Sequence, residues 1–109
     1  MLSQETEHQI VEALRPLAPE RVILFGSHAW GEPDCDSDLD LYVVTSDDEI
    51  PQNFRERSAL YQRYAFALEK LYGKIAIDLI VHTRVMHRQF VQQDSLFCRK
   101  IMTAGIPLI

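Results

Sequence analysis

The fold is decided by residues 24–44, which read LFGSHAWGEPDCDSDLDLYVV. An apolar run ends at Gly26 and Ser27, and a second run rich in β-branched and aromatic residues begins at Leu39. This pattern predicts a strand over residues 21–26, a short turn or helix over 27–31, and another strand from residue 39 to 44. The glycine turn therefore connects the first strand to a loop that leads into the second.

Two carboxylates stand at the start of the second predicted strand, at Asp38 and Asp40. Residues i and i+2 of a strand point to the same face, about 6.6 to 7 Å apart along it. Two like charges this close repel each other, and a bound divalent cation removes the conflict. Oxygen ligands of this kind suit Mg²⁺, which binds one or two carboxylates together with waters and substrate phosphates.

The Gly26-Ser27 turn predicts an anion site beside this acid pair. Glycine adopts backbone conformations that other residues avoid. If a short helix begins at Ser27, its free backbone amides and the serine hydroxyl face outward and favour a phosphate. The stretch thus combines a phosphate cradle with a metal-binding acid pair.

Other glycine- and aspartate-rich motifs do not fit this stretch. The spacing of Gly26 and Gly31 is that of a P-loop, but Glu32 and Pro33 stand where Lys and Ser or Thr are required. A calcium loop beginning at Asp34 would need glycine where Leu39 stands. The chain has no G-x-G-x-x-G sequence, so a dinucleotide-binding fold has no support.

A third acid, Asp78, lies in the apolar run of residues 75–82, which predicts a further strand. Alternation along that strand places Asp78 on one face with Ala76, Ile80 and His82. A buried carboxylate without a partner is costly, so Asp78 needs one. Two partners are open: a metal shared with Asp38 and Asp40, or a salt bridge to Arg84.

The remaining sequence predicts helices over residues 3–16, 54–72 and 84–104, the last broken near residues 94–95. Residues 105–109 form an apolar tail that either tucks into the fold or serves as a contact. The expected architecture is α/β (α+β): a small mixed sheet with helices on one face and an open catalytic side.

Composition limits the functional classes. The 109 residues fit a single domain, 1–109, with 47% hydrophobic residues. The net charge of −5 argues against direct nucleic-acid binding. No signal peptide and no membrane-spanning run are visible, and the two cysteines lack zinc-type spacing, so we expect a cytoplasmic protein with free thiols.

One motif resembles the signature of the DNA polymerase β-like nucleotidyltransferase superfamily. It consists of Gly26-Ser27, then ten residues, then Asp38-x-Asp40. The similarity is closest to its minimal nucleotidyltransferases, the antitoxins (MNT) paired with HEPN-domain toxins. The resemblance implies a polymerase β-like palm fold and makes Asp78 the third metal-binding acid. Members of the family often carry Arg where this chain has Trp30.

The resemblance also implies the activity: an antitoxin that transfers AMP from ATP, with Mg²⁺, to a tyrosine hydroxyl of a partner HEPN ribonuclease toxin. Asp38, Asp40 and Asp78 would be catalytic and metal-binding, and Gly26 and Ser27 would hold the nucleotide phosphates. An alternative is a non-catalytic antitoxin that neutralises its toxin by binding alone, which Trp30 and the apolar tail favour. Transfer to a small molecule ranks last, because the short chain leaves little room for such a pocket.

Overall fold

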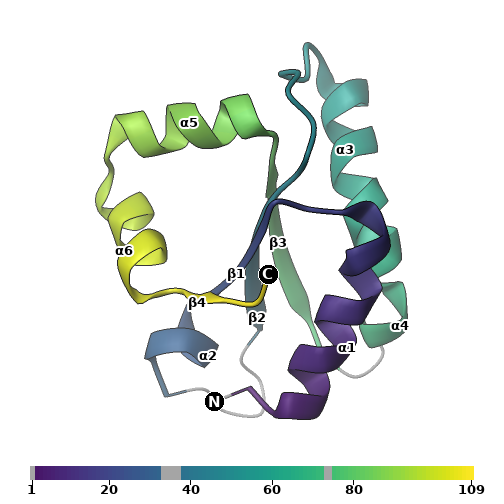
Figure 1. Ribbon diagram of the computed structural model, residues 1–109, viewed down its shortest axis with the longest axis vertical. Helices are drawn as coiled ribbons and strands as arrows, with labels where there is room; N and C mark the ends of the chain where they lie inside the picture. Colours follow the sequence, from purple (N-terminus) through teal and green to yellow (C-terminus); the bar gives the residue numbers. More distant parts are fainter. Residues whose placement is uncertain (1, 33–37, 73–74) are drawn as a thin grey trace.

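The computed structural model describes residues 2–32, 38–72 and 75–109. Four strands form one sheet: β1 (Arg21–Phe25), β2 (Leu39–Val44), β3 (Ile77–His82) and β4 (Ile106–Pro107). The helices are α1 (Gln4–Leu14), the 3-10 turn η1 (Arg15–Leu17), α2 (Ser27–Trp30), α3 (Phe54–Ala67), α4 (Glu69–Tyr72), α5 (Arg84–Gln93) and α6 (Leu96–Ala104). Figure 1 shows the sheet between two groups of helices.

The sheet is mixed, with strand order β3-β2-β1-β4. β2 runs antiparallel to β1 and parallel to β3, and β4 pairs antiparallel with β1. The parallel pair is connected through α3, as a parallel connection needs a crossover rather than a hairpin. This register places Asp40 of β2 between Phe25 of β1 and Asp78 of β3.

The larger part of the core lies between the sheet and the helices α1, α3 and α4. Residues from alternate positions of β1 and β2 meet Ile10 and Leu14 of α1 and Tyr64 of α3. Ile75, Ile77, Leu79 and Val81 pack against the same cluster, as the alternation in the sequence predicts. This side of the sheet is therefore closed, and it fixes the strands that carry the acids.

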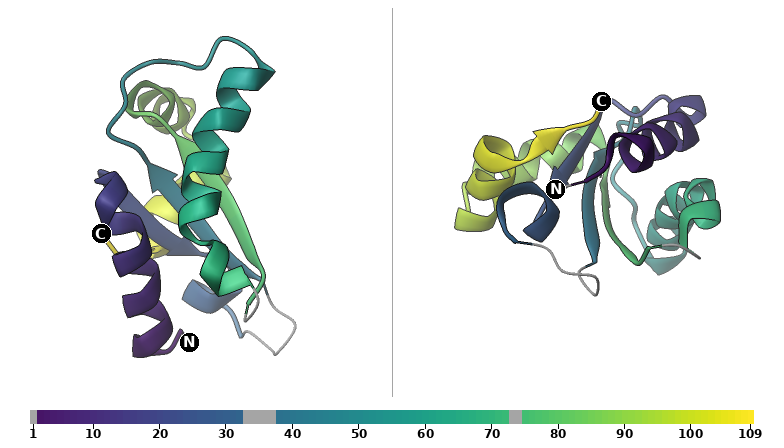
Figure 2. Two further views of the ribbon diagram at one scale, coloured as in Figure 1. Left: turned by 90° about the vertical axis from the view of Figure 1, so that its right-hand side faces the viewer. Right: turned by 90° about the horizontal axis from the view of Figure 1, so that it is seen from below.

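The opposite face of the sheet is partly covered by α5 and α6, which corrects the expectation of helices on one face only. Ile23 and Phe25 of β1 and Tyr42 and Val44 of β2 form a second buried cluster with Ile101 of α6. Because these strand positions are apolar on both faces, a second layer of helices is needed to bury them. Figure 2 shows the two helical layers on either side of the strands.

The apolar tail forms the edge strand β4 instead of remaining free. The backbone N–H of Leu108 donates to the carbonyl oxygen of Val22 at 2.7 Å, and Ile106 and Leu108 pack on the larger core cluster. Pro107 is tolerated because the strand lies at the edge of the sheet. A two-residue strand is too short for alternation to reveal it in the sequence.

Two predicted helices are divided in the structure. The break near residues 94–95 is confirmed: Asp94 adopts the left-handed conformation with φ 52°, and Ser95 begins α6 by accepting a hydrogen bond from the Cys98 N–H. The helix predicted over 54–72 is interrupted at Leu68, which separates α3 from α4. None of the helices in the described ranges is long and apolar enough to cross a membrane.

Candidate functional site

The acid-bearing side of the site is built by β2 and β3. Asp40 and Asp78 are direct neighbours across the parallel pair, and Asp38 stands one residue before β2. Asp40 is half-buried, whereas Asp38 and Asp78 are exposed. The three carboxylates that the sequence singles out thus lie at one end of the sheet, on the face that Tyr42 shares.

Gly26 lies against the Asp40 carboxylate. Its φ is 76°, and a Cβ atom built there would come within 2.0 Å of Asp40 Oδ2. Glycine is therefore required twice, for the backbone conformation and for the space beside the acid. Ser27 follows as the first residue of the one-turn helix α2, where the sequence predicts a short helix to begin.

The environment of Asp40 disfavours its charged form. Burial raises the pKa of Asp40 above its usual range, and the charges of Asp78 and Asp38 and a hydrogen bond with Asp78 raise it further. The nearby His28 acts in the opposite direction and lowers this pKa. A cation placed between the carboxylates would relieve the repulsion, so the donor chemistry fits a divalent metal.

Within the part of the chain that the structure describes, no three metal-ligating side chains converge on one point. The closest arrangement is the Asp40–Asp78 pair, with Asp38 near enough to influence the pKa of Asp40. Mg²⁺ is commonly held by one or two carboxylates, with its other ligands coming from water and substrate phosphates. The pair therefore fits Mg²⁺ that arrives together with a nucleotide.

Arg84 is not the partner of Asp78. Its guanidinium donates to Glu20 and, at 3.1 Å, to Asp48 Oδ1. These bonds hold the start of α5 beside the residue that precedes β1 and the loop that follows β2. Of the two partners that the sequence leaves open for Asp78, the salt bridge is absent here, and Asp78 faces Asp40 instead.

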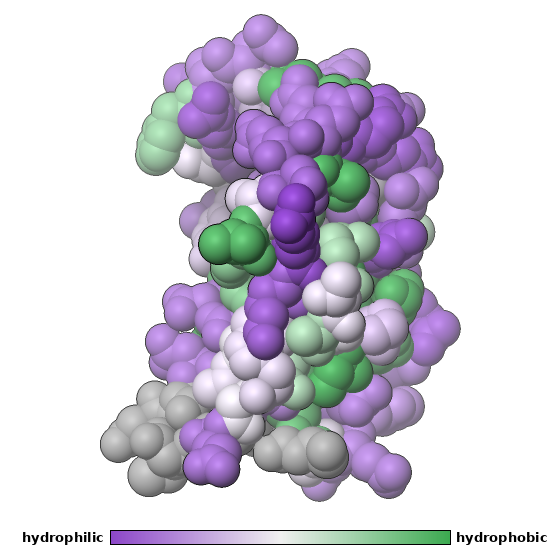
Figure 3. Space-filling model, turned by 90° about the vertical axis from the view of Figure 1, so that its left-hand side faces the viewer, coloured by the Kyte–Doolittle hydropathy of each residue, from purple (hydrophilic) through white to green (hydrophobic). Residues whose placement is uncertain are grey.

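An aromatic cluster borders the acids on the side of α2 and α6. The ring centroid of Phe25 lies 6.4 Å from that of Trp30 and 5.6 Å from that of Phe97. The Lys100 ammonium lies 5.1 Å from the Trp30 ring centroid, a cation–π contact. Figure 3 shows this side of the molecule with small hydrophobic patches among polar side chains.

The structure also reveals a partly buried polar cluster that sequence reasoning missed. The hydroxyl of Tyr42, which is fully buried, lies 3.0 Å from His82 Nδ1 and 2.7 Å from His87 Nδ1. Burial lowers the pKa of both histidines. A phenol has one proton to donate, so one imidazole accepts it and the other donates its own N–H. The spacing of five residues between the histidines gives no sign of this shared partner.

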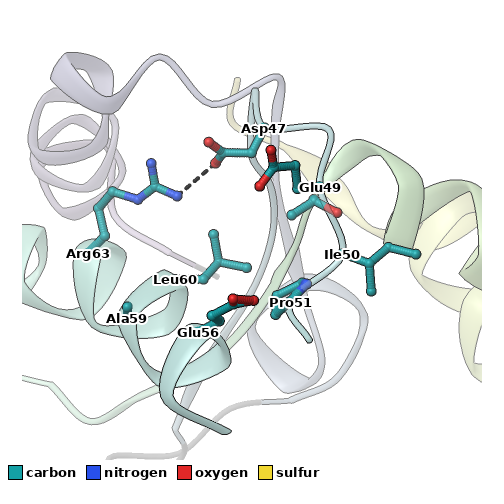
Figure 4. A pocket seen from close by; sticks show the side chains of 9 residues that line it. Asp47, Glu49, Ile50, Pro51, Glu56, Ala59, Leu60 and Arg63 are labelled. Carbon is teal, nitrogen blue, oxygen red and sulfur yellow. Dashed lines mark hydrogen bonds and ion pairs between the residues drawn. The ribbon is translucent and has the colours of Figure 1, made fainter. Parts of the chain in front are cut away.

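A cavity of about 500 Å³ lies at the other end of β2, between α3 and the loop that follows the strand. Asp47 and Arg63 form an ion pair of 2.7 Å at its rim (Figure 4). Burial raises the pKa of Asp47, but hydrogen bonds from Arg63 and Thr45 together with the Arg63 charge bring it below its usual range. Because the acids stand at the opposite end of the strand, this cavity is separate from them.

The mixed sheet agrees with the nucleotidyltransferase fold that the sequence resemblance implies. Residues 8–109 match the family described as polymerase beta, nucleotidyltransferase, and the chain belongs to this family. A search of curated proteins found no match.

Solved structures share the fold. A chain in a toxin–antitoxin crystal structure with AMP-PNP is 26% identical, with a TM-score of 0.57; the match covers 94% of this chain and 72% of that one. A chain from the toxin–antitoxin MntA–HepT is 24% identical, with a TM-score of 0.53 and coverage of 98% and 72%. A third chain is from a rebuilt and re-refined structure of a tri-AMPylated Shewanella oneidensis HEPN toxin in complex with MNT antitoxin. It is 23% identical, with a TM-score of 0.53 and coverage of 99% and 72%. The fold is thus the one found in MntA/MNT antitoxins of HEPN toxin pairs.

Proposed function

We propose that this chain is an antitoxin that transfers AMP from ATP to a tyrosine hydroxyl of a partner HEPN-domain ribonuclease toxin. Membership of the nucleotidyltransferase family supports the reaction class. The similar chain crystallised with AMP-PNP supports an adenine nucleotide, and the tri-AMPylated toxin in complex with an MNT antitoxin supports AMP as the transferred group. The added phosphodiester would silence the toxin by its charge and bulk.

The observation that carries this proposal is the position of Asp40. Its carboxylate lies between the Gly26 backbone and Asp78, and its pKa is raised by burial and by neighbouring acids. Such an arrangement costs stability unless a cation neutralises it. A carboxylate with a raised pKa beside a glycine turn is a candidate functional group.

In the reaction, the acceptor oxygen attacks the α-phosphorus of ATP, and the bond to the bridging oxygen breaks as pyrophosphate leaves. Gly26 and the hydroxyl of Ser27 hold the β- and γ-phosphates and so stabilise the leaving group. Asp40 and Asp78, together with Asp38, would hold Mg²⁺, which would neutralise phosphate charge and lower the pKa of the attacking hydroxyl. Asp78, on the far side of Asp40 from Gly26, takes the proton that the acceptor releases.

Intact-mass measurement tests the proposal. The HEPN-domain protein encoded beside this chain is incubated with the purified chain, ATP and Mg²⁺, and its mass is followed. We expect a gain of one or more AMP groups, and we expect Asp40→Asn to reduce the rate by at least about 100-fold. Glu49→Gln is the matched control, because it removes a carboxylate from the separate cavity and should leave the rate unchanged.

Neutralisation by binding alone is the competing function. The exposed Trp30 favours it, but the apolar tail no longer does, because the tail is paired in β4. A stable complex without any mass gain, together with full neutralisation by Asp40→Asn, would replace the catalytic proposal with this one.

A further inference from the structure

The order of the strands sets the direction from which an acceptor must approach. This step rests on the proposed function. In an in-line displacement, the attacking oxygen and the leaving pyrophosphate lie on opposite sides of the phosphorus. Gly26 follows β1, Asp40 is in β2 and Asp78 is in β3, so the three positions follow one another across the sheet. With the leaving group at Gly26, the acceptor enters over β3.

A cavity of about 370 Å³ lies on that side, between β3, α5 and α6. Ile80 and His82 line it from β3. Ile80 is two residues beyond Asp78, on the same face of the strand, which is about 6.6 to 7 Å along it. The cavity therefore opens within one side-chain length of the acid that faces the acceptor.

The lining of this cavity is a mixture of apolar, aromatic and amide side chains. Phe90 of α5 and Phe97 of α6 meet edge to face, with their ring centroids 6.2 Å apart. The residues described as lining the cavity include no Asp, Glu, Lys or Arg. Burial and the nearby His87 lower the pKa of His82, so its ring is neutral at physiological pH. Such a surface suits an aromatic side chain better than a phosphate or a charged residue.

Two amide side chains, Gln89 and Gln93, stand at the exposed edge of the same cavity. They are one helical turn apart on α5 and so point to the same side. Each amide offers donors and an acceptor, which match the N–H and C=O groups of an extended peptide. The cavity thus presents an apolar floor with peptide-binding groups at its rim.

We propose that this cavity is the acceptor subsite and takes the ring of the target tyrosine from the partner protein. The ring lies over Ile80 against Phe90 and Phe97, its hydroxyl reaches Asp78, and the flanking backbone contacts Gln89 and Gln93. The phenol oxygen forms the new bond to the α-phosphorus, pyrophosphate leaves, and the phenol proton passes to Asp78.

The test fills the cavity from its exposed edge. Gln89→Trp and Gln93→Trp add bulk at exposed positions, and Gln92→Trp is the matched control, since Gln92 is exposed on the same helix outside the lining. The rate of AMP transfer is measured against the concentration of the HEPN-domain protein, and the affinity for ATP with Mg²⁺ is measured by calorimetry. We expect kcat/KM for the protein acceptor to fall by about 10-fold or more in both cavity variants, with the ATP affinity and the control unchanged.

Three results would contradict the subsite. Unchanged transfer by both cavity variants would show that the acceptor ring binds elsewhere. A parallel loss of ATP affinity, with melting temperatures intact, would assign the cavity to the donor nucleotide. Absence of transfer by the unchanged protein would overturn the proposed function itself, and this inference with it. Gln93→Glu adds a charge with little added bulk and should also impair transfer. It keeps the inference testable if a tryptophan variant folds poorly.

Discussion

Asp40 occupies a position that lowers the stability of the folded protein when it is charged. Its pKa is raised by burial and by Asp78 and Asp38. A folded-state pKa above the unfolded value means that the ionised carboxylate is less favourable in the folded chain than in the unfolded one. We therefore expect Asp40→Asn to have an equal or higher Tm than the unchanged protein at pH 7.5 without metal.

With Mg²⁺ added, we expect the unchanged protein to have a higher Tm than Asp40→Asn. Because the ion binds only the folded site, it raises the Tm of the unchanged protein and leaves that of Asp40→Asn unaffected. Thermal unfolding with and without Mg²⁺ and ATP measures both effects. A Tm for Asp40→Asn well below that of the unchanged protein would mean that the carboxylate is structural and would contradict the metal site.

Gly26 tolerates no side chain. A Cβ atom there would lie 2.0 Å from Asp40 Oδ2, and the positive φ adds backbone strain. We expect Gly26→Ala to lower the free energy of unfolding by about 1 to 3 kcal/mol and to abolish AMP transfer, because Asp40 is displaced. Urea denaturation and the mass assay measure the two effects, and a fully active variant would contradict the close approach.

The Tyr42 hydroxyl is the shared partner of two half-buried imidazoles, His82 and His87. Its removal leaves both ring nitrogens without this hydrogen bond. We therefore expect Tyr42→Phe to cost about 1 to 3 kcal/mol of unfolding free energy, even though its volume hardly changes. Val44→Ala provides a comparison, since it removes only apolar contacts from the same cluster. A neutral Tyr42→Phe would show that the histidines pair with water instead.

At the scale of the elements, α6 is positioned by a glycine. A Cβ atom at Gly105 would lie 2.3 Å from the Ile101 carbonyl oxygen and 2.5 Å from Ile23 Cγ2. We expect Gly105→Ala to push α6 away from β1 and to destabilise the fold by about 1 to 3 kcal/mol, as overpacking does. Ala104→Gly is a useful contrast, because it alters the neighbouring helix end without adding atoms. An unchanged Tm for Gly105→Ala would contradict the close packing.

The sequence predicts these elements unevenly. Strands β1, β2 and β3 stand out because each carries a largely apolar run of five or six residues. β4 has only Ile106 and Pro107. It is a strand because it pairs with β1, which is distant in the sequence, and no local pattern predicts that pairing. The break at Leu68 is hidden for a similar reason, since Leu68 is fully buried and continues the apolar pattern of the helix before it.

For the whole molecule, the half-buried histidines His82 and His87 make stability depend on pH near neutrality. Burial lowers the pKa of His82 and His87, with the Arg21 charge adding to the effect at His87 and Glu20 opposing it. Below the ordinary histidine pKa of about 6.5, the unfolded chain binds more protons than the folded one. The histidine contribution to stability is therefore fully present above about pH 7 and is lost as the pH falls below 6.5.

Urea denaturation at pH 7.5 and pH 5.5 tests this pH dependence, with His87→Gln expected to give a flatter profile. The raised pKa of Asp40 acts in the opposite direction as the pH falls, so the comparison with His87→Gln isolates the histidine effect. A stability that rises from pH 7.5 to pH 5.5 would contradict neutral histidines in the folded protein.

The sequence predicts only part of the candidate site. Local spacing identifies Gly26, Ser27, Asp38 and Asp40, because all four lie within a short stretch. Alternation assigns Asp78 to the correct face, but its register beside Asp40 depends on the crossover through α3. The cavity beside it depends on how α5 and α6 pack, which local patterns do not encode.

One consequence concerns α5, none of whose ten residues is fully buried. The free energy of local opening is smallest where few apolar side chains are buried. Backbone amides of α5 should therefore exchange with deuterium sooner than those of α1 or α3, which anchor the larger core. The wall of the acceptor cavity would then open locally more often than α1 and α3 do, which would admit a bulky protein substrate while the strands below keep their register.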